Sequence, residues 1–239
     1  MYIQYWFDLP PVQMYGGHEC SSLGELLQLP NYNNIKFIDY GNLQLTELPE
    51  LPTSLIEMDC NNNYLKELPE LPSSLIILNC DSNDLIMLPE LPNSLRKLDC
   101  SNNILKKLPK LPNSLRHLNC YDNRLTTLPD LPNRLKKIFC GNNMITMLPK
   151  LPNSLTLLNC NSNRLTILPE LPDSLQSLIW YSNFLYYYFK NKCGGNLEIY
   201  YKENKIFANK IGTWFLECKY NPKYKYCRDR VDKEYDSYK

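Results

Sequence analysis

A twenty-residue repeat constrains the fold of this chain more than any other feature. From Leu55 onward the unit returns without insertion, as in LRKLDCSNNILKKLPKLPNS from Leu95 and LRHLNCYDNRLTTLPDLPNR from Leu115. A fixed period of this length is typical of solenoids, in which each unit packs only against its neighbours. A degenerate unit precedes the regular ones and starts at Ile35, so that the chain contains about eight units.

Each unit predicts one short strand and an extended return. In the segment from Lys97 to Ser101, Leu98 and Cys100 point to one side and the polar residues to the other. Twenty residues leave no room for a crossover helix, and the repeated LPxLP prolines favour an extended polyproline backbone. We therefore expect a parallel β-sheet on the concave face, a polyproline-type or irregular convex side, and little helix.

The pattern LxxLxCxxNxL followed by LPxLP resembles the leucine-rich repeat, in its short twenty-residue "LPX" class, over residues 35–190. Such repeats are known in effector proteins of pathogenic bacteria, and similar ones occur in proteins of giant DNA viruses. The resemblance implies a leucine-rich-repeat solenoid, or horseshoe, that binds a partner protein through its concave strand face. It also divides the chain into an N-terminal segment (1–34), the repeats (35–190) and a small mixed C-terminal cap (191–239) that is basic and Tyr-rich.

Six cysteines recur at the third apolar position of successive units. That position faces the core, where a free cysteine acts as a small hydrophobic residue, and a narrow coil has little interior volume to fill. Neighbouring strands lie close enough for disulfides, but parallel Cβ vectors and a reducing compartment favour packing over redox pairing or metal binding. We predict free buried thiols at Cys60, Cys80, Cys100, Cys120, Cys140 and Cys160.

Three further features serve the structure. Trp180 takes the cysteine column in the last unit and Tyr40 takes it in the first, as large rings that seal the ends. The segment from Ser22 to Glu25 predicts a capping box and a short helix over the first repeat edge. An asparagine column is expected to turn inward and bond to loop backbone groups, at Asn63, Asn83, Asn103, Asn123, Asn143 and Asn163.

The outward strand residues divide into an acidic zone, a basic and aromatic middle, and an apolar end near Leu157, Ile179 and Tyr181. Aromatic side chains dominate binding hot spots, so the middle zone is the predicted site for a partner protein. Arg96, Arg116 and Lys136 lie beside this zone in the sequence pattern. The predicted partner-binding residues are Lys97, His117, Asn119, Tyr121, Lys137 and Phe139.

Two other function classes remain open beside the protein-binding scaffold. A structural or self-assembling protein, for instance one associated with a virion, would use Leu157 and Ile179 as a contact. Some bacterial effectors with such repeats carry a ubiquitin ligase with a Cys-x-Asp motif, whose letters recur at Cys227 to Asp229. The C-terminal tail is far shorter than that catalytic domain, so we expect no enzyme activity.

Composition limits the partners. The net charge of +1 gives no overall attraction to nucleic acid. Residues 186–239 are basic, with twelve Lys/Arg, but seven Asp/Glu among them dilute this charge, so nucleic acid is not the expected partner. His18, Cys20 and His117 are not part of a paired CxxC or HxxxH motif, so a zinc site is not expected. The Asp and Asn residues at outward strand positions lack the glycine-rich loop that binds calcium. No cofactor is expected. The apolar N-terminal segment lacks the basic n-region of a signal peptide, and no run of eighteen apolar residues forms a membrane span. We therefore expect a cytoplasmic protein, located in the host cytosol if it is a viral protein or an effector.

Overall fold

The computed structural model describes residues 2–7 and 17–184 of the 239-residue chain. An N-terminal part contains β1 (Ile3–Trp6), β2 (His18–Cys20), α1 (Leu23–Leu27) and the 3-10 turn η1 (Tyr32–Asn34). Eight strands of three residues follow at twenty-residue intervals: β3 (Phe37–Asp39), β4 (Glu57–Asp59), β5 (Ile77–Asn79), β6 (Lys97–Asp99), β7 (His117–Asn119), β8 (Lys137–Phe139), β9 (Leu157–Asn159) and β10 (Ser177–Ile179).

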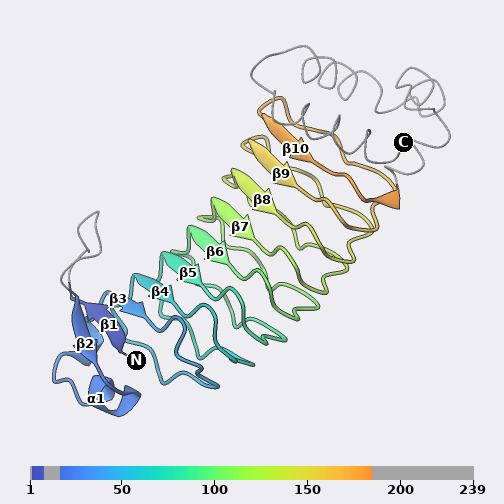
Figure 1. Cartoon of the computed structure of the whole chain (residues 1–239). Helices are drawn as coiled ribbons and strands as arrows, with labels where there is room; N and C mark the ends of the chain where they lie inside the picture. Colours follow the sequence, from blue (N-terminus) through green and yellow to red (C-terminus); the bar gives the residue numbers. More distant parts are fainter. Residues whose placement is uncertain (1, 8–16, 185–239) are drawn as a thin grey trace, which may run out of the picture.

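The strands form one ten-stranded sheet along one side of a solenoid, with the irregular return segments along the other side (Figure 1). Strands β3 to β10 are parallel and paired in sequence order, and each residue lies beside its equivalent twenty positions away, as Leu98 does beside Leu78 and Leu118. The predicted leucine-rich-repeat solenoid is confirmed. Its constant register follows from the constant repeat length, because every turn of the coil closes after the same number of residues.

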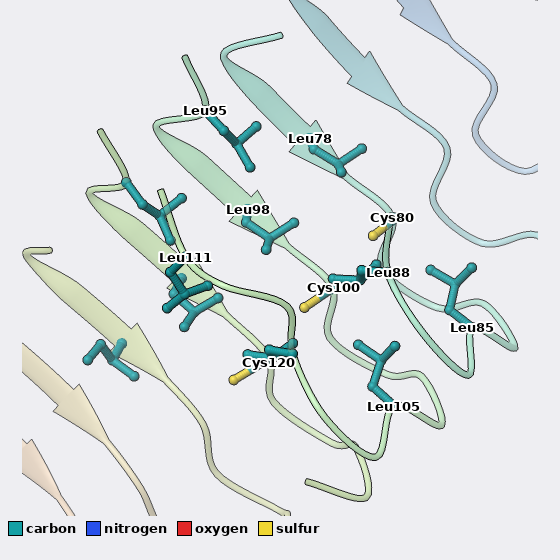
Figure 2. Packing of buried hydrophobic residues seen from close by; sticks show 14 of the residues in the cluster. Leu78, Cys80, Leu85, Leu88, Leu95, Leu98, Cys100, Leu105, Leu111 and Cys120 are labelled. Carbon is teal, nitrogen blue, oxygen red and sulfur yellow. The ribbon is translucent and has the colours of Figure 1, made fainter. Parts of the chain in front are cut away.

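The core is a continuous stack of the apolar columns. In the β6 unit Leu95, Leu98, Cys100, Leu105 and Leu108 are all buried, and the neighbouring units repeat this arrangement. Figure 2 shows that equivalent leucines of successive units, such as Leu78 and Leu98, lie in rows along the core. Burying one such side chain contributes about 1.5–3 kcal/mol, so each unit depends on the units beside it for its stability.

The cysteine ladder is buried, which confirms the prediction of free, buried thiols. All six ladder cysteines are fully buried and none is in a disulfide. The sulfurs of Cys80, Cys100 and Cys120 point the same way rather than toward one another (Figure 2). Burial raises the pKa of each thiol, to about 12 for Cys140, because a thiolate would lose its hydration in this core. The six cysteines therefore fill the core of the solenoid.

The asparagine column ties consecutive units together. Asn103 is buried, and its amide nitrogen donates to the carbonyl oxygens of Cys80, Cys100 and Ser101 over 3.0, 3.3 and 2.8 Å. Its Oδ1 accepts from the Leu85 N–H at 2.9 Å. One side chain thus bonds to four backbone groups in two units, which ties these units together. Equivalent bonds to the cysteine carbonyl of the preceding unit join Asn83, Asn123, Asn143 and Asn163 to their neighbours, and Asn63 bonds in the same way to the carbonyl of Tyr40.

A second column of polar residues precedes the asparagine column, and the backbone conformation explains its composition. The residue before each buried asparagine, and Asn42 before Leu43 in the first unit, has a left-handed backbone with φ between 50° and 60°. Asn, Asp and Ser tolerate this region better than β-branched or bulky residues. The column consists of Asn42, Asn62, Ser82, Asn102, Asp122, Asn142, Ser162 and Ser182. It turns the chain sharply from the strand into the return segment.

The N-terminal end differs from the prediction in one respect. Ser22 caps the helix as predicted, because its Oγ accepts from the Glu25 N–H at 3.2 Å, while Glu25 Oε2 accepts from the Ser21 N–H, one residue before the cap, at 2.8 Å. However, β1 rather than the helix covers the sheet edge, by pairing antiparallel with β3. Helix α1 packs beside β2 and contributes Leu26 to the core. The predicted helical cover was wrong because a strand satisfies the edge N–H and C=O groups directly, which a helix cannot do.

The C-terminal predictions fall largely outside the described residues. The cap expected over 191–239, the end of the repeats at 190 and Cys227 all lie there. Trp180, in the last described unit, is partly buried and packs against the core, in the column that the cysteines occupy elsewhere. Tyr40 takes that column in the first unit and is fully buried.

Candidate protein-binding surface

The outward side chains of β3 to β10 form the surface that we call the strand face. Its backbone groups are paired along the ladder, for example Arg116 N–H with Arg96 C=O at 2.8 Å and Cys100 N–H with Asn119 C=O at 2.8 Å. A ligand on this face therefore meets side chains rather than free backbone groups, except at the sheet edges. Specificity must come from the residues of the columns.

Three predicted binding residues form one row. The register places Lys97 beside His117 and His117 beside Lys137, on β6, β7 and β8. Both lysines are exposed and His117 is half-buried. The pKa of His117 lies below its usual value, first because burial disfavours the imidazolium and then because Lys137 and Lys97 repel it. At neutral pH the row therefore carries two ammonium groups around a neutral imidazole.

The predicted aromatic residues belong to adjacent units. Phe139 on β8 is half-buried and stands beside Asn119 and Asn159 in the register. Tyr121 is half-buried beyond the end of β7, and its ring covers Gly141, where an added Cβ would come within 2.7 Å of Tyr121 Cε2. Glycine at 141 therefore leaves room for the Tyr121 ring. The two rings give this part of the strand face its large apolar side chains.

Asn119 has a different environment from the other five residues. Its Nδ2 donates to Asp99 Oδ2 at 2.9 Å and to Ser101 Oγ at 3.1 Å, and its Oδ1 accepts from the Tyr121 N–H at 3.2 Å. The same bond joins Asn79 to Asp59 at 2.9 Å. Asn119 thus belongs to a polar ladder that Phe139 interrupts one strand later. We name the remaining five residues the central patch: Lys97, His117, Tyr121, Lys137 and Phe139.

The two flanking zones are also partly buried. In the acidic zone, burial raises the pKa of Glu57 and of Asp59, while Lys97 lowers that of Glu57 and the Asn61 N–H lowers that of Asp59. At the apolar end Leu157 and Ile179 are half-buried. Phe37 occupies the same register column as the exposed Lys97, but it is only 6% exposed and pairs with Trp6 of β1.

Sequence reasoning missed an exposed apolar group away from the strand face. Ile86, Met87, Met147 and Ile167 lie on the return segments, with between 41% and 64% of each side chain exposed. The repeat alignment contains their signal, since their columns are otherwise mostly charged residues or threonine. An open hollow lies between the return segments around Leu131 and Leu151.

No group of three metal-ligating side chains is found among the described residues. Of the two metal candidates in the N-terminal part, Cys20 is buried and His18 stacks on Tyr5 with ring centroids 5.2 Å apart. A search of residues 2–7 and 17–184 finds no helix that is long and apolar enough to span a membrane.

Comparison with known proteins identifies the relatives of this architecture. No protein-family model matches the sequence, and no curated protein sequence matches it. Among solved structures, YopM from Yersinia enterocolitica WA-314 is 42% identical with a TM-score of 0.58, over 59% of this chain and 31% of its own. YopM from Yersinia pestis, described as a leucine-rich effector protein, is 36% identical with a TM-score of 0.54, over 62% of this chain and 49% of its own. The matched region is thus less than two thirds of the length of either relative.

Proposed function

This chain is a leucine-rich repeat protein of the short twenty-residue type found in bacterial effectors, and we propose that it is a non-enzymatic scaffold whose partner protein docks on the strand face. The central patch is the proposed docking site. Its lysines are exposed, its two aromatic rings belong to adjacent units, and its five residues come from three consecutive units. A solenoid offers such a surface without any change of its own shape.

The interruption of the polar ladder by Phe139 is the observation that carries the proposal. At the equivalent position the neighbouring strands have Asn119 and Asn159, and Asp99 lies one strand further. Phe139 cannot make the hydrogen bonds of this column, and the exposed part of its ring is apolar surface that a ligand can cover. Aromatic residues beside cations are enriched at the energetically dominant points of protein interfaces.

We further propose that the protein acts on host proteins in the cytosol, as an effector does. The likeness to a leucine-rich effector protein supports this role. The seven cysteines of the described residues are free, and a set of free thiols fits a reducing compartment.

Affinity capture from cytosolic extract tests the docking site. Wild type is compared with the double variant Phe139→Ala/Lys137→Glu, and the retained proteins are identified by mass spectrometry. The matched control is Met147→Ala/Lys150→Glu, which makes the same kinds of change at two exposed residues of a return segment. We expect a partner that wild type and the control retain and the double variant loses.

The outcomes separate the function classes. If all three proteins retain the same set, the central patch is not the docking site. If the retained protein is a second copy of this chain and binding is lost on Leu157→Glu, the self-assembling alternative replaces the scaffold. If capture requires Cys227 and yields a thioester, the ligase alternative replaces it.

A further inference from the structure

Six basic side chains form a compact array at the start of three consecutive strands. Two residues come from each unit, one immediately before the strand and one at its first position. Five of the six are exposed and His117 is half-buried. We call this set the basic array: Arg96, Lys97, Arg116, His117, Lys136 and Lys137.

The sheet register brings the array together. The first-position residues are direct neighbours, and the residues before them are joined by backbone bonds, Arg116 N–H to Arg96 C=O and Lys136 N–H to Arg116 C=O, each 2.8 Å. Adjacent strands lie about 4.8 Å apart, so three strands span roughly 10 Å. Five permanently charged groups therefore occupy an area that one short segment of a ligand can cover.

The array has little compensation from the protein itself. In the column of Lys97, the carboxylate that interacts with this lysine is Glu57, two units away. The influences on the pKa of His117 are burial and four cations, Lys137, Lys97, Lys136 and Arg116, all of which lower it. Like charges held this close repel one another, and an anionic ligand would relieve that repulsion.

The array also has defined ends. In the same two columns the preceding unit has Ile76 and Ile77, and the following unit has Thr156 and Leu157. All four of these residues are half-buried on the sheet. Basic residues thus occupy three units, and uncharged residues, three of them apolar, border these units on both sides.

We propose that the partner is recognised through a carboxylate-rich peptide segment, flanked by apolar residues, that crosses the amino-terminal ends of β6, β7 and β8. An extended segment advances about 3.3 Å per residue, so three or four residues span the array and the next ones reach Ile77 and Leu157. A nucleic acid strand fits less well, because its phosphates would continue past the array onto apolar units. This inference rests on the proposed docking function and specifies the chemistry of the partner.

Fluorescence anisotropy of labelled probes tests the inference on the full chain. The main probe is a peptide with four consecutive glutamates between leucines, and the comparison probes replace the glutamates by glutamines or consist of ten uridylates. The array variant is Lys97→Glu/Lys137→Glu. The control is Lys110→Glu/Lys150→Glu, two exposed lysines with the same forty-residue separation on the return segments.

We expect wild type to bind the glutamate peptide at least about tenfold more tightly than the glutamine peptide, with the preference weakening as salt increases. The array variant should lose about tenfold in affinity for the glutamate peptide and the control should not. Circular dichroism and the thermal midpoint verify that both variants fold, and Lys97→Gln/Lys137→Gln gives a milder second test. Equal binding of both peptides, equal losses in both variants, or tighter binding of the oligouridylate would overturn the inference.

The result is distinguishable from the capture experiment. If Phe139→Ala/Lys137→Glu loses a partner but no glutamate peptide binds, the docking surface stands and the acidic segment is wrong. If the peptide binds through the array but capture is unchanged, the charge preference stands and the docking site of the partner lies elsewhere.

Discussion

The thiol of Cys100 donates to the backbone carbonyl oxygen of Asn119 in the next unit, with an Sγ to oxygen distance of 3.4 Å. The same bond joins Cys60 to Asn79 at 3.4 Å and Cys80 to Asp99 at 3.3 Å. The carbonyl is already an acceptor in the ladder, from the Cys100 N–H at 2.8 Å. A small apolar residue with a weak donor therefore suits this column, since it fills the coil and leaves its S–H satisfied.

Native thiol labelling should be slow along the ladder. We expect the six cysteines to react with a maleimide about a hundredfold more slowly than an exposed thiol, because the sulfurs are buried and burial raises their pKa. Peptide-resolved mass spectrometry measures each rate, and Lys107→Cys supplies an exposed thiol in the same unit as Cys100. Labelling of all six in denaturant without reductant is the second expected result. A requirement for reductant would mean disulfides instead.

Removal of one inward asparagine should weaken the whole solenoid. Asn103→Ala leaves the N–H of Leu85 without its acceptor and removes one of the two amide donors to the carbonyl of Cys80, and we expect a loss of about 1–3 kcal/mol in the free energy of unfolding. Guanidinium denaturation followed by circular dichroism measures it. The matched variant Asn113→Ala changes an exposed asparagine and should stay within about 0.5 kcal/mol of wild type. Similar losses for both would contradict the tie between units.

The column of residues with a left-handed backbone predicts an unusual order of stability among substituted variants. Asn102 has a φ of 50°, so Asn102→Gly should be more stable than Asn102→Val by about 1–2 kcal/mol. Both variants lose the bond from Asn102 Nδ2 to Asp81 Oδ1, and their difference therefore reports the backbone conformation. Thermal and chemical denaturation measure that difference. The same pair of changes at Asn113, which is outside this column, should not favour glycine, and an equal preference there would refute the explanation.

The titration of His117 tests the environment of the central patch. The chain has two histidines, so His18→Gln leaves His117 as the single imidazole whose titration proton NMR follows. We expect the pKa of His117 to lie below about 6.5, and to rise in Lys97→Gln/Lys137→Gln, because those lysines disfavour the imidazolium. Since the folded pKa is depressed, this group stabilises the fold above the unfolded pKa and loses that contribution as the pH falls toward the folded value. A pKa that does not respond to the lysine changes would mean that the row is not formed.

The sheet register and the N-terminal cap differ in how far sequence predicts them. Repetition alone places Leu98 beside Leu78 and Leu118, because identical units that pack in a stack have one common register. The pairing of Tyr5 with Ile38 and of Trp6 with Phe37 has no such signal. It joins segments that differ in pattern, and the local sequence from Met1 to Phe7 is too short to indicate its partner.

The candidate site shows the same division. Alternation identifies Lys97, His117, Tyr121, Lys137 and Phe139 as outward residues, and the register follows from the repeat. The hydrogen bonds that engage Asn119 in the ladder, the burial of Phe37 under β1 and the space that Gly141 leaves for the Tyr121 ring depend on the neighbouring side chains. These contacts are not encoded in any single column.

Sequence by itself determined the solenoid, its inward columns of leucine, cysteine and asparagine, and the outward columns. The reason is that a constant repeat turns a long-range problem into a local one, solved once and copied. Tertiary structure alone decided that a strand closes the N-terminal edge and that Phe37 is buried beside it. Those features arise where different segments meet in space, and their energies depend on distances between side chains that the order of residues does not specify.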